Sequence, residues 1–463
     1  MDRLLRLALQ SLIRRGTLDV ATARGATFRC GDGAEPRVAI RFTTAGAQRG
    51  ILLDPDLRLG ECYMDGTLVI ERDTIAALLE LVFGQDPMAK TASWALPRWC
   101  VRYIARRRQQ WNRQSRSRKN VAHHYDLDGR LYALFLDGDR QHSCAYFETP
   151  DQSLDDAQLA KKRHLAAKLL IERGNRILDI GSGWGGLALY FAEICGAHVT
   201  GVTLSKEQLH AAAARAGERG LSDAANFRLQ DYRELNGTFD RIVSLGMFEH
   251  VGIVHYNAYF RECAARLADD GVMVLHAHRA VGIAGRDQSV DCQVYFPGRL
   301  HSFALGGASR DRAGRIARHR HRNPAAALCG HAEGLARALP CAPRGGGAAY
   351  DERCVRMWEF YLAASEMAFR GQNMMVFQIQ IAKRQGVVPM THDYIMREED
   401  RCGAAGETRV RRCDSLASES SSMNAPHLKL PVSRCELRDD AASVPPPRLS
   451  SVADRVIAMS QQS

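Results

Sequence analysis

Short apolar runs alternate with helical patterns through the middle of the chain. Arg176–Ile180 is a short apolar run that predicts a buried strand, and a glycine-rich turn leads from it into the helical pattern of residues 187–193. Further strands are predicted at residues 198–203, 239–252 and 271–278. Strands and helices that alternate in this order predict a doubly wound α/β fold, in which helices cover both faces of a parallel sheet.

The first part of the chain has a different pattern, which predicts a small α+β unit ahead of the main sheet. Residues 1–15 indicate an amphipathic helix, because leucines alternate with arginines there. The other elements predicted in this unit are strand-like stretches at residues 27–32, 37–44 and 50–71 and a helix at residues 73–84. The first helix either packs on the small sheet, which we favour, or lies on an anionic membrane surface.

Length and composition indicate a soluble globular protein of two or three domains. The chain has 463 residues, of which 46% are hydrophobic and 25% are charged. No apolar run reaches the roughly 18 residues of a membrane-spanning helix, and the N-terminal residues do not resemble a signal peptide. The thirteen cysteines lack CxxC spacing, which predicts reduced thiols in the cytoplasm and neither a metal site nor a disulfide framework.

The net charge of +11 is concentrated in two segments. Residues 102–119 hold eight basic side chains and no acidic one, interleaved with aromatic residues. Such a stretch fits a solvated linker helix or a contact with lipid phosphates, and nucleic acid is a third, less favoured interpretation. The second basic segment is residues 299–349.

The glycine-rich turn is the first candidate binding site. Gly181, Gly183, Gly185 and Gly186 would let a ligand approach the backbone at the N-terminus of a helix. The spacing is not that of the GxGxxG dinucleotide fingerprint, and no P-loop lysine follows. S-adenosylmethionine is therefore the better candidate. A second cluster precedes the sheet and combines several chemically active side chains: His123, His124, Tyr125, His142, Cys144 and Tyr146.

Several sequence blocks, taken together, resemble one enzyme family. The blocks are HHYDL, SCAYF, LDIGSGWGGLA, GVTLSKEQ, DYREL and FDRIVSLGMFEHVG. They resemble cyclopropane-fatty-acyl-phospholipid synthases, mycolic acid cyclopropane synthases and related lipid C-methyltransferases. The resemblance covers about residues 1–298 and 349–397 and is strongest over 120–276. It implies a class I S-adenosylmethionine-dependent methyltransferase fold (Rossmann-like) preceded by a small lipid-binding domain.

The resemblance also implies positions for two ligands. The adenosylmethionine contacts correspond to His142, Ser143, Leu178, Asp179, Ile180, Gly181, Ser182, Gly183, Trp184, Gly185, Gly186, Thr203, Leu204, Ser205, Lys206, Glu207, Gln208, Asp231 and Tyr232. The catalytic residues, which hold a bicarbonate base, correspond to Cys144, Glu249 and His276, together with the residue two beyond His276 and a later tyrosine. Glu249 could instead cap the helix that follows it. Because Glu249 and His276 lie at the carboxyl ends of adjacent predicted strands, we expect both at the edge of the sheet where such folds bind ligands.

The implied reaction is methylene transfer to the cis double bond of an unsaturated phospholipid acyl chain, giving a cyclopropane fatty acid. The protein would be cytoplasmic and peripheral to the inner face of the membrane, with no nucleic-acid partner; a homodimer stays open. Two alternatives remain. The chain could be a catalytically impaired homologue that still binds cofactor or lipid, or it could be a lipid C-methyltransferase with a methyl-branched product.

The sequence departs from the family pattern in places. His142, Ser182, Ser365 and the pair His278 and Arg279 stand where the family commonly has other residues. Residues 299–349 lack apolar periodicity and contain no tyrosine, and we interpret them as a compensated frameshift; a basic RNA-binding insert is the alternative. The predicted boundaries are an N-terminal domain (1–90), a basic linker (91–119), a catalytic domain (120–298 and 350–400) and a disordered tail (401–463).

Overall fold

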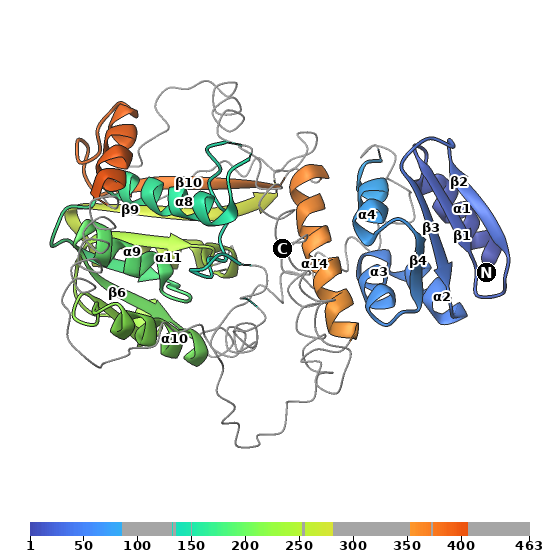
Figure 1. Ribbon diagram of the computed structural model, residues 1–463, viewed down its shortest axis with the longest axis horizontal. Helices are drawn as coiled ribbons and strands as arrows, with labels where there is room; N and C mark the ends of the chain where they lie inside the picture. The colour runs from blue at the N-terminus through green and yellow to red at the C-terminus, as the bar shows by residue number, and fades with distance from the viewer. Residues whose placement is uncertain are drawn as a thin grey trace, which may run out of the picture.

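The structure is a computed structural model that describes residues 1–85, 132, 136–149, 151–251, 255–280, 352–371 and 374–405 (Figure 1). The predicted basic linker, the histidines at positions 123 and 124, the 299–349 segment and residues 406–463 lie outside the described residues. Within the described part of the chain, no helix combines the length and the apolar character needed to cross a bilayer.

The N-terminal unit is a four-stranded sheet with helices packed against it. Its elements are α1 (Asp2–Leu12), β1 (Thr17–Ala21), β2 (Thr27–Gly31), β3 (Arg37–Phe42), α2 (Ala45–Leu53), α3 (Pro55–Met64), β4 (Leu68–Arg72) and α4 (Ile75–Phe83). The strand order is β2-β1-β3-β4, with β1 and β3 parallel and the other pairs antiparallel. This is the α+β unit that the sequence predicts.

The strand predicted over residues 50–71 is wrong for most of its length. Residues 45–64 form α2 and α3, and only Leu68–Arg72 is a strand. The side chain of Thr44 accepts a hydrogen bond from the N–H of Ala47 and so caps α2. Pro55 stands in the first turn of α3, where its missing N–H and fixed φ favour a helix start. These two start signals outweigh the apolar run between them.

Helix α1 packs on the small sheet through one face only. Leu5 is fully buried in the core of this unit, which confirms the packing interpretation. Leu4 and Leu7 are 62% and 64% exposed, and Arg3 and Arg6 beside them are exposed too. The helix therefore presents a second face on which apolar and basic side chains are mixed.

The main sheet has six strands in the order β10-β9-β8-β5-β6-β7, with only β10 antiparallel to its neighbour. Its strands are β5 (Arg176–Ile180), β6 (His198–Thr203), β7 (Ala225–Leu229), β8 (Phe239–Leu245), β9 (Leu267–Ala280) and β10 (Met374–Ala382). Its helices are α8 (Leu154–Leu169), α9 (Gly186–Cys195), α10 (Lys206–Glu218) and α11 (Tyr256–Arg266), with short 3-10 turns η3 (Tyr232–Glu234) and η4 (Phe248–His250).

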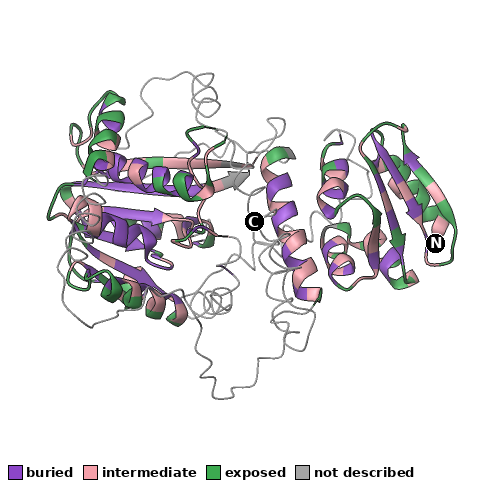
Figure 2. Ribbon diagram, in the orientation of Figure 1, coloured by how far each residue is buried: buried purple, intermediate pink, exposed green. Residues whose placement is uncertain are grey.

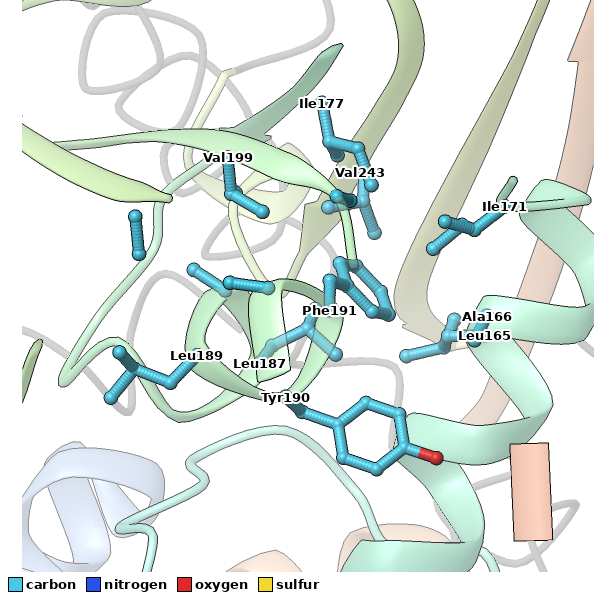
Figure 3. Packing of buried hydrophobic residues seen from close by; sticks show 14 of the residues in the cluster. Leu165, Ala166, Ile171, Ile177, Leu187, Leu189, Tyr190, Phe191, Val199 and Val243 are labelled. Carbon is cyan, nitrogen blue, oxygen red and sulfur yellow. The ribbon is translucent and has the colours of Figure 1, made fainter. Parts of the chain in front are cut away.

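Both faces of the main sheet are covered, because alternate residues of β5 belong to different cores. Ile177 packs with α8 and α9, in the cluster around Phe191 that Figure 3 shows. Leu178, the next residue, packs with Tyr259 and Phe260 of α11 in a second cluster. The central strands of the main sheet lie between these two clusters and are largely buried (Figure 2). The doubly wound α/β architecture predicted from the sequence is therefore confirmed.

Helix α14 (Glu352–Gly371) connects the two units, standing between the N-terminal helices and the main sheet in Figure 1. Its residues Ala363 and Met367 belong to the core of the N-terminal unit, and Glu359 accepts a hydrogen bond of 2.8 Å from the hydroxyl of Tyr63. The sequence groups residues 350–400 with the catalytic domain; the first half of that range shares the N-terminal core.

The start of the predicted disordered tail also needs correction. Residues 393–405 are helical, so ordered structure continues five residues past the predicted start at 401. Cys402 is buried in the core beside α9, and the Arg401 guanidinium donates a hydrogen bond of 2.9 Å to the carbonyl of Ile171. These contacts hold the end of the helix against the main sheet.

Candidate active site

The glycine-rich turn between β5 and α9 has the backbone geometry of a ligand-binding bend. Gly181, Gly183 and Gly185 all have positive φ, a conformation that side chains with a Cβ rarely adopt. No atom of the described residues lies within 4 Å of where a Cβ on Gly183 would stand. Space therefore remains over the middle of the bend.

Gly186 serves a different purpose, since it lets another segment approach the start of α9. A Cβ there would lie 2.7 Å from the Gln141 side chain and 2.9 Å from that of Asp139. Asp139 is held by three cations, from Lys162, Arg215 and Arg219. These ion pairs fix residues 137–143 over the bend, and so bring the predicted ligand residues His142 and Ser143 to it.

Three buried polar atoms at this bend have no hydrogen-bond partner among the described residues: Asp179 Oδ2, Ser182 Oγ and Trp184 Nε1. Leaving such groups unpaired is unfavourable, so they suit a ligand that supplies donors and an acceptor. Burial raises the pKa of Asp179 to about 7. A cationic ligand such as S-adenosylmethionine would favour its ionised form, so the donor set fits that cofactor.

Asp179→Asn should change both stability and ligand binding. The folded-state pKa of Asp179 lies above its unfolded value near 4, so the folded state holds an extra proton between about pH 4 and 7. The wild-type free energy of unfolding should therefore fall as the pH rises from about 4 to 7, by up to about 1.4 kcal/mol per pH unit from this group. The variant should lack that fall, and should bind S-adenosylmethionine roughly tenfold more weakly.

Urea unfolding at pH 5 and pH 8, with calorimetry of cofactor binding, measures both effects. The exposed Asp223→Asn variant is the matched control. An unchanged pH dependence in Asp179→Asn would show that Asp179 is not the titrating group.

The other predicted cofactor residues lie at the carboxyl ends of β6 and β7, beside the bend. Thr203 Oγ1 donates to Gln208 Oε1 at 2.8 Å, and Ser205 caps α10 by accepting from the N–H of Gln208. Asp231 is buried and paired with Arg233 at 2.6 Å. Leu178 is a fully buried core residue. Contact with a cofactor remains a prediction for all of these residues.

Glu249 lies past the end of β8 rather than inside the strand predicted over residues 239–252. Its side chain caps neither η4 nor α11, so the alternative role as a helix cap finds no support among the described residues. Strand β8 ends at Leu245, and Glu249 lies in η4. Its Oε1 accepts a hydrogen bond of 2.8 Å from the backbone N–H of His278. The same oxygen lies 2.9 Å from the Nδ1 of that residue. His278, a departure from the family pattern, thus holds Glu249 on β9. Glu249 Oε2 is buried without a partner among the described residues.

Burial and local charge set the ionisation of the pocket around Glu249. Burial raises the pKa of Glu249, but hydrogen bonds and charge from His278 outweigh it, so the net pKa is lowered. Burial raises the pKa of Cys144 to about 11, with opposing contributions from Lys161 and Glu249. Burial lowers the pKa of His276 to about 3. Near neutral pH the pocket therefore holds a carboxylate, a neutral thiol and a neutral imidazole.

Through its hydrogen bond with the N–H of His278, Glu249 lies against β9 two residues from His276, and Cys144 is the third member of the predicted set. The charge of Glu249 acts on both of the others. Thiol and imidazole can donate hydrogen bonds, and the free Oε2 of Glu249 can accept one. A small anion that carries one proton, such as bicarbonate, matches this set. Its contact with these residues remains a proposal.

Sequence reasoning missed several residues of the pocket. Lys161 is fully buried, and its ammonium donates to Ser143 Oγ at 2.7 Å and to Gln141 Oε1 at 3.1 Å. Gln378 of β10 contacts His276, and the hydroxyl of Tyr361, bonded to Ser365, lies near Cys144. The sequence alone gives no signal that Lys161 is buried beside Ser143. The other contacts need the tertiary fold.

Comparisons with known proteins agree with the motifs. The profile of the mycolic acid cyclopropane synthetase family matches residues 112–299. The cyclopropane-fatty-acyl-phospholipid synthase of Escherichia coli (strain K12) is 33% identical over 352 residues, which are 74% of this chain and 87% of that protein. A probable fatty acid methyltransferase of Pseudomonas putida is 35% identical over 274 residues, 57% of this chain and 68% of the relative.

Among solved structures, the cyclopropane synthase MmaA2 from Mycobacterium tuberculosis is 28% identical, with a TM-score of 0.47, and covers 57% of this chain and 98% of its own. The E. coli relative covers most of both chains, and the doubly wound sheet and its glycine bend have the predicted form. The chain therefore belongs to the cyclopropane synthase family of S-adenosylmethionine-dependent methyltransferases, which includes the cyclopropane-fatty-acyl-phospholipid and mycolic acid cyclopropane synthases.

Proposed function

We propose that this protein transfers the methyl carbon of S-adenosylmethionine to the cis double bond of an unsaturated phospholipid acyl chain and closes a cyclopropane ring. The carbon–sulfur bond breaks, a carbon–carbon bond forms, and loss of a proton from the resulting cation closes the ring. The observation that carries the proposal is the buried Oε2 of Glu249, which has no partner among the described residues and belongs to a carboxylate whose charge acts on both Cys144 and His276. The activity of the E. coli relative, as its name gives it, supports the substrate class.

The chain's own residues would orient the reactants and manage one proton. The bend at Gly181–Gly186 and the carboxylate of Asp179 would hold the cofactor, whose sulfonium methyl is the electrophile. Cys144, Glu249 and His276 would hold a bicarbonate base. Alignment of the reacting carbons can lower the barrier by as much as about 7–11 kcal/mol. The site would have to exclude water during the reaction, because water would convert the cation to an alcohol.

Two alternatives predict different products. A catalytically impaired homologue is suggested by the lack of tyrosine in residues 299–349, a segment outside the described residues. Tyr361 argues for activity, because it places a phenol near Cys144. A lipid C-methyltransferase would release a methyl-branched chain rather than a ring.

Incubation of the full chain with labelled S-adenosylmethionine and unsaturated phosphatidylethanolamine vesicles separates these outcomes. Mass spectrometry should find cyclopropane acyl chains, and depletion of bicarbonate should lower their yield. Methyl-branched chains would favour the C-methyltransferase. Cofactor binding by calorimetry with no lipid product at any bicarbonate concentration would show an impaired homologue.

We also propose that the outward face of α1 rests on the membrane that carries the substrate. Leu4 and Leu7 can enter the acyl boundary while Arg3 and Arg6 contact lipid phosphates, as amphipathic interfacial helices do. The double variant Leu4→Ser/Leu7→Ser should reduce co-sedimentation with anionic vesicles roughly tenfold. The matched control is Leu53→Ser, whose side chain is 69% exposed on α2. Equal loss in both variants would argue against a specific role for α1.

A further inference from the structure

The orientation of the Gln378 side chain is fixed by a lysine. Gln378 of β10 stands opposite His276 of β9 in the sheet register. Its Oε1 accepts a hydrogen bond of 2.7 Å from the ammonium of Lys168, a buried residue of α8. An ammonium group can only donate, so the amide oxygen must face Lys168. The amide nitrogen therefore faces His276, with Nε2 lying 3.1 Å from His276 Nδ1.

This contact selects one form of the imidazole. An amide N–H can only donate, so His276 Nδ1 must accept and the ring proton must lie on Nε2. Burial lowers the pKa of His276 to about 3, the charges of Lys161, His278 and Lys168 lower it as well, and only Glu249 raises it. The ring is therefore neutral near pH 7, and a single tautomer defines its hydrogen bonding.

We propose that Gln378, oriented by Lys168, is a positioning residue that keeps His276 as an Nε2–H donor toward the anion bound beside Cys144 and Glu249. This inference rests on the proposed function for the identity of the anion. It assigns His276 to binding, so the imidazole is not the base of the reaction. The contacts Lys168–Gln378–His276, which we call the relay, join α8, β10 and β9. These elements are distant in sequence.

Nitrogen NMR of the full chain with labelled histidine tests the tautomer without any need for activity. Wild type should show His276 with Nε2 protonated and no titration between pH 5 and 8. Gln378→Glu keeps the side-chain shape and the contact with Lys168, but its carboxylate can only accept, so it should move the ring proton to Nδ1. Gln380→Glu, two residues along β10 and bonded to Lys168 O and Tyr394, is the matched control and should keep the wild-type tautomer.

A second experiment measures bicarbonate itself: carbon NMR gives its binding affinity, and initial rates give its KM. Gln378→Glu should weaken bicarbonate roughly 10- to 100-fold, with cofactor affinity unchanged. A wild-type His276 protonated on Nδ1 would overturn the relay whether or not the protein makes cyclopropanes. A tautomer that shifts without any change in bicarbonate affinity would overturn its role toward the anion. Failure of the proposed function alone would show as a correct tautomer with no lipid product.

Discussion

Glu249→Gln is expected to lower the rate of cyclopropane formation by about 100-fold or more, because the bicarbonate that Glu249 would hold is the positioned base, and loss of a positioned base has an effect in this range. The substitution keeps the shape of the side chain, and the amide oxygen can still accept from the backbone N–H of His278. It removes the negative charge and can place an NH₂ where the buried Oε2, which has no partner among the described residues, would accept a hydrogen bond from the bound anion. Cofactor affinity should be unchanged, because Glu249 lies outside the glycine bend.

Initial rates with labelled S-adenosylmethionine, measured over a series of bicarbonate concentrations, separate KM from kcat. The control is Glu71→Gln, which neutralises an exposed carboxylate paired with Arg41 on the N-terminal unit. A rate within twofold of wild type for Glu249→Gln would exclude Glu249 from the chemistry. If Glu249→Gln lost cofactor binding as well as the reaction rate, a general structural defect would be the explanation.

Lys161→Met is expected to remove a large pH dependence of stability. The net pKa of Lys161 is about 7. Burial and the charge of Lys162 lower it, and the charges of Asp137, Cys144 and Asp139 raise it. Between about pH 7 and 10 the unfolded chain therefore binds one proton more than the folded chain. The wild-type free energy of unfolding should rise with pH across this window, by up to about 1.4 kcal/mol per unit from this group.

The methionine variant should lose this rise, because it has no proton to release. At pH 7 the free energy of unfolding of the variant should also be about 1–3 kcal/mol lower than that of wild type, because Ser143 Oγ and Gln141 Oε1 lose their donor. Removal of the buried charge partly offsets this loss. Urea denaturation at pH 7, 8 and 9 measures the slope. Lys383→Met, which removes a lysine paired with Asp269 at the surface, should keep the wild-type slope. Parallel slopes in Lys161→Met and wild type would show that Lys161 does not titrate in this range.

The pocket's local chemistry depends on which groups the fold desolvates. Lys161, Cys144 and His276 each have a pKa moved toward the neutral form by burial. Glu249 stays ionised, because His278 supplies two hydrogen bonds to it, and Lys161, with a pKa of about 7, is about half protonated at neutral pH. One fixed carboxylate among groups that donate hydrogen bonds suits an anion that still carries a proton.

The sequence by itself determined the parts of this protein that depend on neighbours along the chain. The run Arg176–Ile180 and the glycines after it specify a strand, a left-handed bend and a helix start, because residue type and the allowed φ are local properties. The sequence also predicted that Glu249 and His276 would lie at one edge of the sheet, since adjacent parallel strands end at the same edge. Residues 50–71 show the limit, because an apolar run suits a strand or a helix until capping decides.

Only the tertiary structure decided which distant groups complete the pocket. Gln378 lies 102 residues from the His276 that it contacts, and helix α14 shares its apolar residues with a core that begins near residue 5. Lys161 has the sequence surroundings of an ordinary helix lysine, and only the packing of α8 under residues 141–144 removes its water. Hydrogen bonds and desolvation act through space, so periodicity and spacing along the chain carry no record of them.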